Sequence, residues 1–304
     1  MDSHRSSGDL LADRRYRYAE ACLAEGDAAA CADLAGQAIE IAPRFAAAWL
    51  LLGRAREALS ATADARAAYE AARRLDPADT LGAGLHLARL GDDGRGALTP
   101  AYIRALFDGY APRFEHHLVE GLHYVGPALV AGVLPEEPAI FPAVLDLGCG
   151  TGLAGAALRG RAGHLTGVDL SPAMLARART KGCYHRLVEA ELGAFLAGEP
   201  PGSADLCVAA DVFIYCADLR PVLAGIARVL RPGGWAAFTV QSPSSEGEDP
   251  LLGADGRHAH PDAHLRAAAA GADLALRVTK EAAVRTEKGV PVPGRVLALQ
   301  RSPG

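Results

Sequence analysis

The sequence predicts an α/β domain with a doubly wound, mostly parallel sheet, preceded by an all-α module of helical repeats. Two observations indicate this: a 34-residue period near the N-terminus and, from Ala143 onward, short apolar runs that alternate with amphipathic stretches. A third is that half of the residues are hydrophobic, with Ala and Leu prominent, which suits helices and an α/β core. At 304 residues the chain has room for two such units.

The repeat is visible where Ala38-(x)4-Pro43 recurs 34 residues later as Ala72-(x)4-Pro77. The second copy has large and small apolar residues at fixed helix positions: Trp49, Leu52, Gly53, Ala65, Tyr69, Ala72, and then Pro77. In the first copy Arg15 stands in the place of the Trp. This period and pattern resemble tetratricopeptide repeats.

Each helix pair of such a repeat leaves an apolar face that a neighbouring element must cover, and residues 81–90 can supply a further helix. The resemblance implies either a groove that docks a peptide or protein partner, or a module that only packs on the second domain. Both alternatives remain open. The glycine-rich stretch 91–96 ends the repeat, so we expect domains at 1–95 and 96–304.

The second domain opens with predicted strands and helices in alternation, which implies a parallel sheet covered on both faces. The expected strands are 143–147, 164–168, 184–188, 206–210 and 235–240, and the expected helices are 152–159, 172–181 and 219–230. Ser171 followed by proline is a helix N-cap signal.

The string VLDLGCGTG at 144–152 lies at the end of the first of these strands and continues into a glycine-rich loop. Glycines let the backbone approach a ligand at the carboxyl edge of the sheet, where such folds bind nucleotides. The dinucleotide fingerprint is also satisfied, by glycines at 150, 152 and 155 with Asp169 farther on. However, the carboxylate of Asp146 would repel a pyrophosphate, whereas it would attract the ammonium of an amino-acid ligand.

Four motifs in order, VLDLGCGTG, GVDLSPAML at 167–175, DLCVAAD at 205–211 and VLRPGGW at 229–235, resemble the successive motifs of class I methyltransferases. The likeness covers residues 101–301, and the whole arrangement is similar to predicted methyltransferases with N-terminal tetratricopeptide repeats. It implies a Rossmann-like domain with a seven-stranded sheet. It also implies S-adenosylmethionine as cofactor, with S-adenosylhomocysteine as product.

The resemblance assigns residues to the parts of that cofactor. Asp146 would pair with the amino group of the methionine moiety, directly or through water, while Gly148 and Gly150 would give backbone contacts. Asp169 would accept hydrogen bonds from both ribose hydroxyls, which suits a carboxylate. The remaining positions are Leu170 and Met174 beside the adenine, Glu191 near the adenine amino group, where the family often has Asp, and Asp211 at the methionine end.

A segment before the first strand, 106–118, resembles the lid of small-molecule methyltransferases. Tyr110 and Phe114 are four residues apart, so their rings share a helical face and would contact the sulfonium or exclude water, with core packing as the rival interpretation. His117 in this segment and His260 after the fifth strand are candidate bases, because histidine titrates near neutral pH. A surface role is the alternative for each.

Composition restricts the partners and the compartment. The formal charge of −5 without a long basic run argues against binding to nucleic acid or an anionic membrane. The six cysteines show no metal or disulfide spacing, and His258 with His260 lacks a third ligand, so we expect reduced thiols and no metal. Without an apolar signal or a spanning segment, a cytoplasmic protein is expected.

The sequence therefore predicts a methyltransferase that acts on an oxygen or nitrogen of a small molecule or a peptide. No Asn-Pro-Pro-Tyr-type motif follows the fourth strand, which disfavours planar nitrogen targets. One alternative is an NAD(P)-dependent oxidoreductase, although no Tyr-x-x-x-Lys base is found. The other is a non-catalytic scaffold that senses the cofactor and binds a partner through its repeats.

Overall fold

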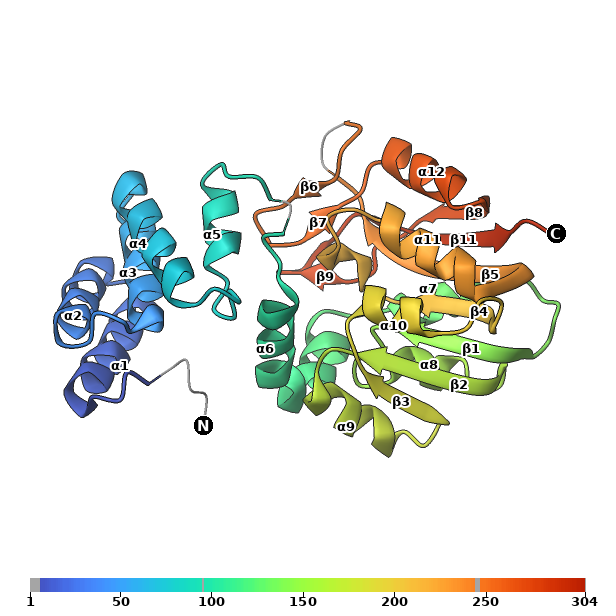
Figure 1. Ribbon diagram of the computed structural model, residues 1–304, viewed down its shortest axis with the longest axis horizontal. Helices are drawn as coiled ribbons and strands as arrows, with labels where there is room; N and C mark the ends of the chain where they lie inside the picture. The colour runs from blue at the N-terminus through green and yellow to red at the C-terminus, as the bar shows by residue number, and fades with distance from the viewer. Residues whose placement is uncertain (1–5, 95, 244–246, 304) are drawn as a thin grey trace. The chain divides into compact units, whose positions relative to one another are not determined.

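The computed structural model describes residues 6–94, 96–243 and 247–303 (Figure 1). The chain divides into two compact units, Met1–Ala105 and Leu106–Gly304. The division falls inside helix α6 (Pro100–Tyr110), later than the expected limit at residue 95, which lies outside the described residues.

The first unit is helical, and helices that follow one another in the chain pack together. Its helices are α1 (Leu10–Ala24), α2 (Ala28–Ile41), α3 (Ala46–Ala58), α4 (Thr62–Leu75) and α5 (Ala83–Arg89). Asp9 and Asp27 begin α1 and α2 as N-caps, accepting hydrogen bonds from backbone N–H groups of the first turn. Gly53 allows close helix packing, because a Cβ there would lie 2.4 Å from a ring carbon of Tyr69.

The second unit contains a nine-stranded sheet, in which seven strands form the main path β3-β2-β1-β4-β5-β11-β8. The strands are β1 (Phe141–Leu147), β2 (Ala162–Asp169), β3 (Arg186–Glu189), β4 (Ala204–Ala209), β5 (Leu230–Gln241), β8 (Leu274–Glu281) and β11 (Gly294–Arg301). The first five are parallel and β11 is antiparallel to both neighbours. The short strands β6 (Leu251–Leu252) and β7 (His258–Ala259) join at β5, and β9 (Thr286–Glu287) pairs with β10 (Val290–Pro291) separately.

Helices cover both faces of this sheet (Figure 1). On one face, α10 (Leu192–Gly198), α11 (Arg220–Val229) and α12 (Asp262–Gly271) pack on alternate strand residues such as Leu145, Cys207 and Phe238. On the other, α7 (Gly126–Gly132) packs on the intervening residues, including Val144 and Val208. This period-2 alternation between two cores is why the strands read as continuous apolar runs.

The Rossmann-like, mostly parallel architecture expected from the sequence is confirmed, with two more strands than the predicted seven. The five expected strands occur as β1 to β5, and the expected helices occur as α8 (Leu153–Ala157), α9 (Pro172–Thr180) and α11. Among the described residues, no helix is both long and apolar enough to cross a membrane.

Candidate functional site

The glycine loop and the acids expected at the site all lie along the carboxyl edge of the parallel strands. The loop follows β1, Asp169 ends β2, Glu191 follows β3 and Asp211 follows β4. Because parallel strands end at a common edge, these side chains come from separate parts of the sequence to one rim of the sheet.

Two glycines of the loop adopt left-handed backbone angles, with φ of +66° at Gly148 and +54° at Gly150. A Cβ on Gly148 would lie 2.6 Å from a methyl group of Val212, so this position admits no side chain. A Cβ on Gly150 would meet only the ring of Phe114, at 4.0 Å. The backbone of Gly150 therefore borders open space beside the lid aromatic.

Asp169 is held by the loop that it faces. Its Oδ2 accepts a hydrogen bond from the backbone N–H of Gly150 at 2.9 Å, and its Oδ1 accepts one from the N–H of Ser171 at 2.9 Å. Burial raises the pKa of this carboxyl, and the two hydrogen bonds oppose the rise. Each oxygen retains a second lone pair that can accept from a ligand hydroxyl.

Asp146 lies beneath the loop, with only 1% of its surface exposed. Its Oδ2 accepts a hydrogen bond from the Tyr184 hydroxyl at 2.6 Å, whereas its Oδ1 is buried without a partner. Burial raises the pKa of Asp146 to about 7, and the charge of Asp169 adds to the rise. Pairing of Asp146 with a ligand ammonium, directly or through water, stays a prediction.

Tyr184 was expected at the start of a strand, and its link to Asp146 was not foreseen from the sequence. The Tyr184 ring occupies space that two glycines leave. A Cβ on Gly155 would lie 2.4 Å from the ring and hydroxyl of Tyr184, and a Cβ on Gly167 would lie 2.7 Å from the same ring. The third glycine of the apparent dinucleotide fingerprint therefore makes room for a tyrosine that contacts the loop acid.

The residues expected around the adenine have different environments. Leu170 is half-buried in the turn after β2, and Met174 is 1% exposed in the first turn of α9, where its N–H donates to Ser171 Oγ at 3.1 Å. Glu191 is exposed, and its Oε2 caps α10 by accepting from Ala194 N–H at 2.8 Å. Their adenine contacts stay predictions.

The lid segment 106–118, which begins in the last turns of α6, is anchored to the turn and helix after β2. Ser171 donates a hydrogen bond to Asp108 at 2.5 Å, and Lys181 of α9 pairs with Glu115 at 2.8 Å. These contacts place the lid beside Asp169 and the glycine loop.

Aromatic residues gather in the same lid. The ring of Phe114 meets those of Tyr110 and Phe107 edge to face, at centroid distances of 5.3 and 6.0 Å. Phe107 in turn meets Tyr215 of the short helix η4 (Phe213–Tyr215) at 5.5 Å. These rings can exclude water from the space beside Gly150.

His117 lies in the π-helical turn η3 (His116–Gly121), and its Nδ1 forms a short hydrogen bond with the Tyr110 hydroxyl. The two lid residues assigned separately from the sequence thus form one pair. When Nδ1 carries the hydrogen and donates it to Tyr110, Nε2 keeps a lone pair that can accept a proton.

His260 has surroundings unlike those of His117. It is fully buried, its Nε2 lies 3.0 Å from the carbonyl oxygen of Phe213, and its ring stacks on that of His264. Burial lowers the pKa of His260 to about 4. Its environment gives no support to a proton-transfer role.

Asp211 forms a buried ion pair that the sequence did not indicate. It has a left-handed φ of +60°, and its N–H donates to Thr239 Oγ1 at 2.8 Å. Both of its carboxylate oxygens accept from Arg285 Nη1, at 2.8 and 3.0 Å. Arg285 precedes β9 and lies 74 residues away in sequence, so no local motif could have revealed this contact.

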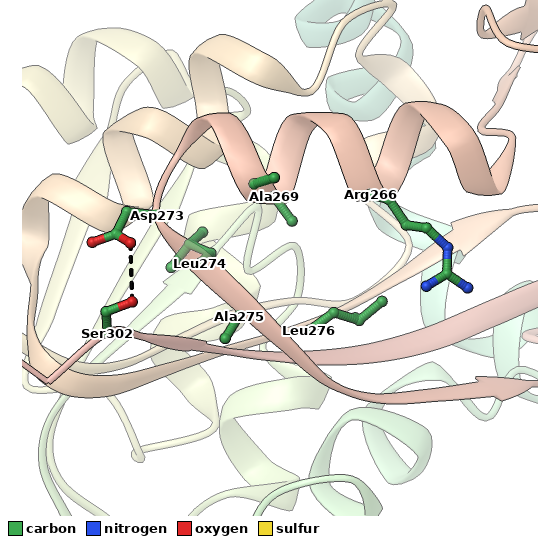
Figure 2. A pocket seen from close by; sticks show the side chains of 8 residues that line it. Arg266, Ala269, Asp273, Leu274, Ala275, Leu276 and Ser302 are labelled. Carbon is green, nitrogen blue, oxygen red and sulfur yellow. Dashed lines mark hydrogen bonds between the residues drawn. The ribbon is translucent and has the colours of Figure 1, made fainter.

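No group of three or more His, Cys, Asp or Glu residues within the described ranges could hold a metal ion. A surface hollow lies between α12 and β8 and is lined by Arg266, Ala269, Leu274 and Leu276, among others; Figure 2 shows it with the Asp273–Ser302 hydrogen bond. The first residues of β8 are near the start of β5, at the amino edge of the sheet. The hollow is therefore separate from the glycine loop.

Comparison with known proteins agrees with this geometry. Residues 145–238 match a family described as "Methyltransferase domain". Ubiquinone biosynthesis O-methyltransferase of Thiobacillus denitrificans is 32% identical over 125 residues, which are 39% of this chain and 53% of the relative. Malonyl-[acyl-carrier protein] O-methyltransferase of Salmonella typhimurium is 34% identical over 141 residues, 45% of this chain and 53% of the relative.

The chain thus spans about half the length of the curated relatives it matches. Among solved structures, magnesium protoporphyrin IX methyltransferase of Synechocystis PCC 6803, which has S-adenosylhomocysteine bound, is 16% identical with a TM-score of 0.51. The match covers 67% of this chain and 99% of that protein. At this identity the likeness concerns the fold. Residues 145–238 are thus similar to a methyltransferase domain, and the order and direction of the strands around them agree with a Rossmann-like fold.

Proposed function

We propose that the chain transfers the methyl group of S-adenosylmethionine to an oxygen or nitrogen of a small molecule or a peptide. The observation that carries the proposal is the rim formed by the open glycine loop and Asp169, with a lid of aromatic residues fastened beside it. Oxygen is favoured as the acceptor atom, because both relatives named above are O-methyltransferases.

The residues of the rim fit such a cofactor. The space beside Gly150, which a Cβ would enter without meeting any atom nearer than 4.0 Å, can admit a ligand next to the backbone. The unpartnered Oδ1 of Asp146 is a buried acceptor that suits a bridging water below an ammonium group. The free lone pairs on Asp169 suit paired ribose hydroxyls.

When bound, the cofactor supplies an electrophilic methyl group on a sulfonium. The chain's own residues would orient and shield the reactants, since an in-line displacement depends mainly on alignment. Asp169 would fix the ribose, and Phe114 with Tyr110 would exclude water. The Nε2 atom of His117 would take a proton from the atom that accepts the methyl group, while the Tyr110 hydroxyl holds Nδ1.

The binding step is tested by calorimetric titration with S-adenosylhomocysteine. Wild type should bind in the micromolar range, and Asp169→Ala should abolish the heat, since it removes both acceptors. Asp205→Ala, which alters a carboxylate near the other end of β4, is the matched control and should bind as wild type does. Absence of heat from wild type would refute the proposal, and tight binding of NADH in a fluorescence titration would favour an oxidoreductase.

For the first unit, we propose that the helix pairs are tetratricopeptide-like repeats available to a protein or peptide partner. In support, α2 and α4 begin and end 34 residues apart, and Gly53 contacts Tyr69 as close packing of such helices requires. Gly53→Ala should lower the thermal midpoint of unfolding. Gly36→Ala, with open space at its Cβ, should raise the midpoint because Ala favours the helix. Equal effects would argue against the repeat packing.

A further inference from the structure

Arg285 is among the largest fully buried side chains of the protein, with 1% of its side chain exposed. It lies in the segment 282–293 that connects β8 to β11 at the carboxyl edge. Its donors are engaged on three sides: Nη1 with Asp211, Nε with Glu287 at 3.0 Å, and Nη2 with Gln241 at 3.1 Å. A guanidinium is rarely buried unless such partners compensate for its lost hydration.

Its partners come from separate strand ends. Asp211 follows β4, Gln241 ends β5 and Glu287 belongs to β9. The segment is in turn fixed to the chain after the lid, because Thr286 N–H donates to the carbonyl oxygen of Leu122 at 2.7 Å. Arg285 therefore joins the ends of β4 and β5 to the segment that follows β8.

Asp211 combines an unusual backbone conformation with a partly exposed carboxylate. Its backbone is held in a left-handed conformation that non-glycine residues rarely adopt. Its side chain keeps 14% of its surface exposed, so the carboxylate is paired with Arg285 yet still accessible. Such a backbone conformation at a partly buried charge is common at functional sites.

We propose that Arg285 is a positioning residue: it keeps Asp211 ionised and oriented, so that Asp211 can receive the ammonium of the cofactor's amino-acid end. The inference rests on the methyltransferase function proposed above. Arg285 itself is buried, with bonds from all three of its nitrogens inside the protein, so it would act through Asp211.

Other charged and titratable groups also face Asp211. They are Arg285, which directly precedes β9, Glu287 in β9, Arg257, which directly precedes β7, Tyr215 in η4 and Tyr124 in the segment before α7. Burial raises the pKa of Asp211, while the charge of Arg285 and then that of Arg257 lower it. Removal of Arg285 thus leaves burial and Glu287 to favour the protonated acid.

The test is S-adenosylhomocysteine titration of wild type and Arg285→Gln at pH 8 and pH 6. Binding by wild type depends on pH through Asp146. The readout is therefore the dissociation constant of Arg285→Gln divided by that of wild type at the same pH. We expect this ratio to grow about tenfold from pH 8 to pH 6, because protonated Asp211 cannot pair with an ammonium. Arg285→Lys, which keeps the charge, should show a ratio that changes less than about threefold.

Two variants serve as controls. Arg231→Gln breaks a different Arg–Asp pair, between Arg231 of β5 and Asp205 of β4 at 2.6 Å, and should leave the ratio constant. If Arg285→Gln does not fold, Asp211→Asn/Arg285→Gln removes both charges and should restore the circular dichroism spectrum, with weak binding and the pH dependence of wild type.

The possible results separate the two proposals. No binding by wild type refutes the methyltransferase function, and the inference falls with it. Wild-type binding with a ratio that is constant between pH 6 and 8 overturns the inference alone. So does a double variant that remains unfolded, because Arg285 would then be needed only for structure.

Discussion

Asp146→Asn should stabilise the α/β unit more at high pH than at low pH. The pKa of Asp146 is raised from 3.8 to about 7, chiefly because burial disfavours the charged form. A raised pKa means that the folded state binds the proton more tightly than the unfolded state. The stability from this group is therefore fully present below pH 3.8 and is lost as the pH rises through 7.

The size of the effect follows from the same values. One pKa unit corresponds to about 1.4 kcal/mol, so the ionised carboxylate costs the folded state about 4 kcal/mol in total. Of this, about 2 to 3 kcal/mol is lost between pH 5 and pH 8. Asparagine does not ionise, so it brings no pH-dependent loss of stability. Its amide adds a buried hydrogen-bond donor, and the stability lost through that donor does not change with pH.

The assay is urea unfolding at pH 5 and pH 8, followed by tryptophan fluorescence. The chain has two tryptophans, Trp49 in the helical unit and Trp235 in β5, so a Trp49→Phe background reports the α/β unit alone. We expect the free energy of unfolding of Asp146→Asn, minus that of the parent, to rise by about 2 kcal/mol from pH 5 to pH 8. A difference in unfolding free energy that stays constant with pH would refute the assignment of a buried carboxyl with a raised pKa beneath the loop.

Four further substitutions test the loop, the lid and the turn that joins them. Gly150→Ala should weaken S-adenosylhomocysteine binding about tenfold in a calorimetric titration, since its methyl group enters the space beside the loop and its φ of +54° disfavours a side chain. Tyr110→Phe and His117→Ala should each lower kcat, and the double variant should lose no more than the worse single one, because the two act as a hydrogen-bonded pair. Additive losses would separate their roles. Ser171→Ala should lower stability by about 1 kcal/mol, measured by thermal unfolding, because it removes the N-cap of α9 and the bond to Asp108.

The sheet and its glycine loop could be predicted from the sequence because their signals are local. Apolar runs of five or six residues between turn signals correspond to β1, β2, β4 and β5, which are buried on both faces. Likewise, Gly148 and Gly150 have the left-handed angles that their residue type allows. Asp169 ends β2, as the strand pattern predicts, and the folded chain brings its Oδ2 to the N–H of Gly150.

The contacts that shape the site were not predictable, because they join residues distant in sequence. Tyr184 reaches Asp146 across 38 positions, through space that only the folded glycines reveal. Arg285 meets Asp211 across 74 positions, and a single arginine in a polar stretch carries no signal for burial. The sequence neighbourhood of His260 was compatible with a base over the rim, yet packing against Phe213 buries its ring.

A crystal structure of the wild-type protein with S-adenosylhomocysteine tests the central claim most directly. We predict that both ribose hydroxyls lie within hydrogen-bond distance of the Asp169 carboxylate, with the amino-acid end near Asp211 and the sulfur below the Tyr110 ring. A ligand found elsewhere, or a ribose whose hydroxyls contact no oxygen of Asp169, would contradict the account.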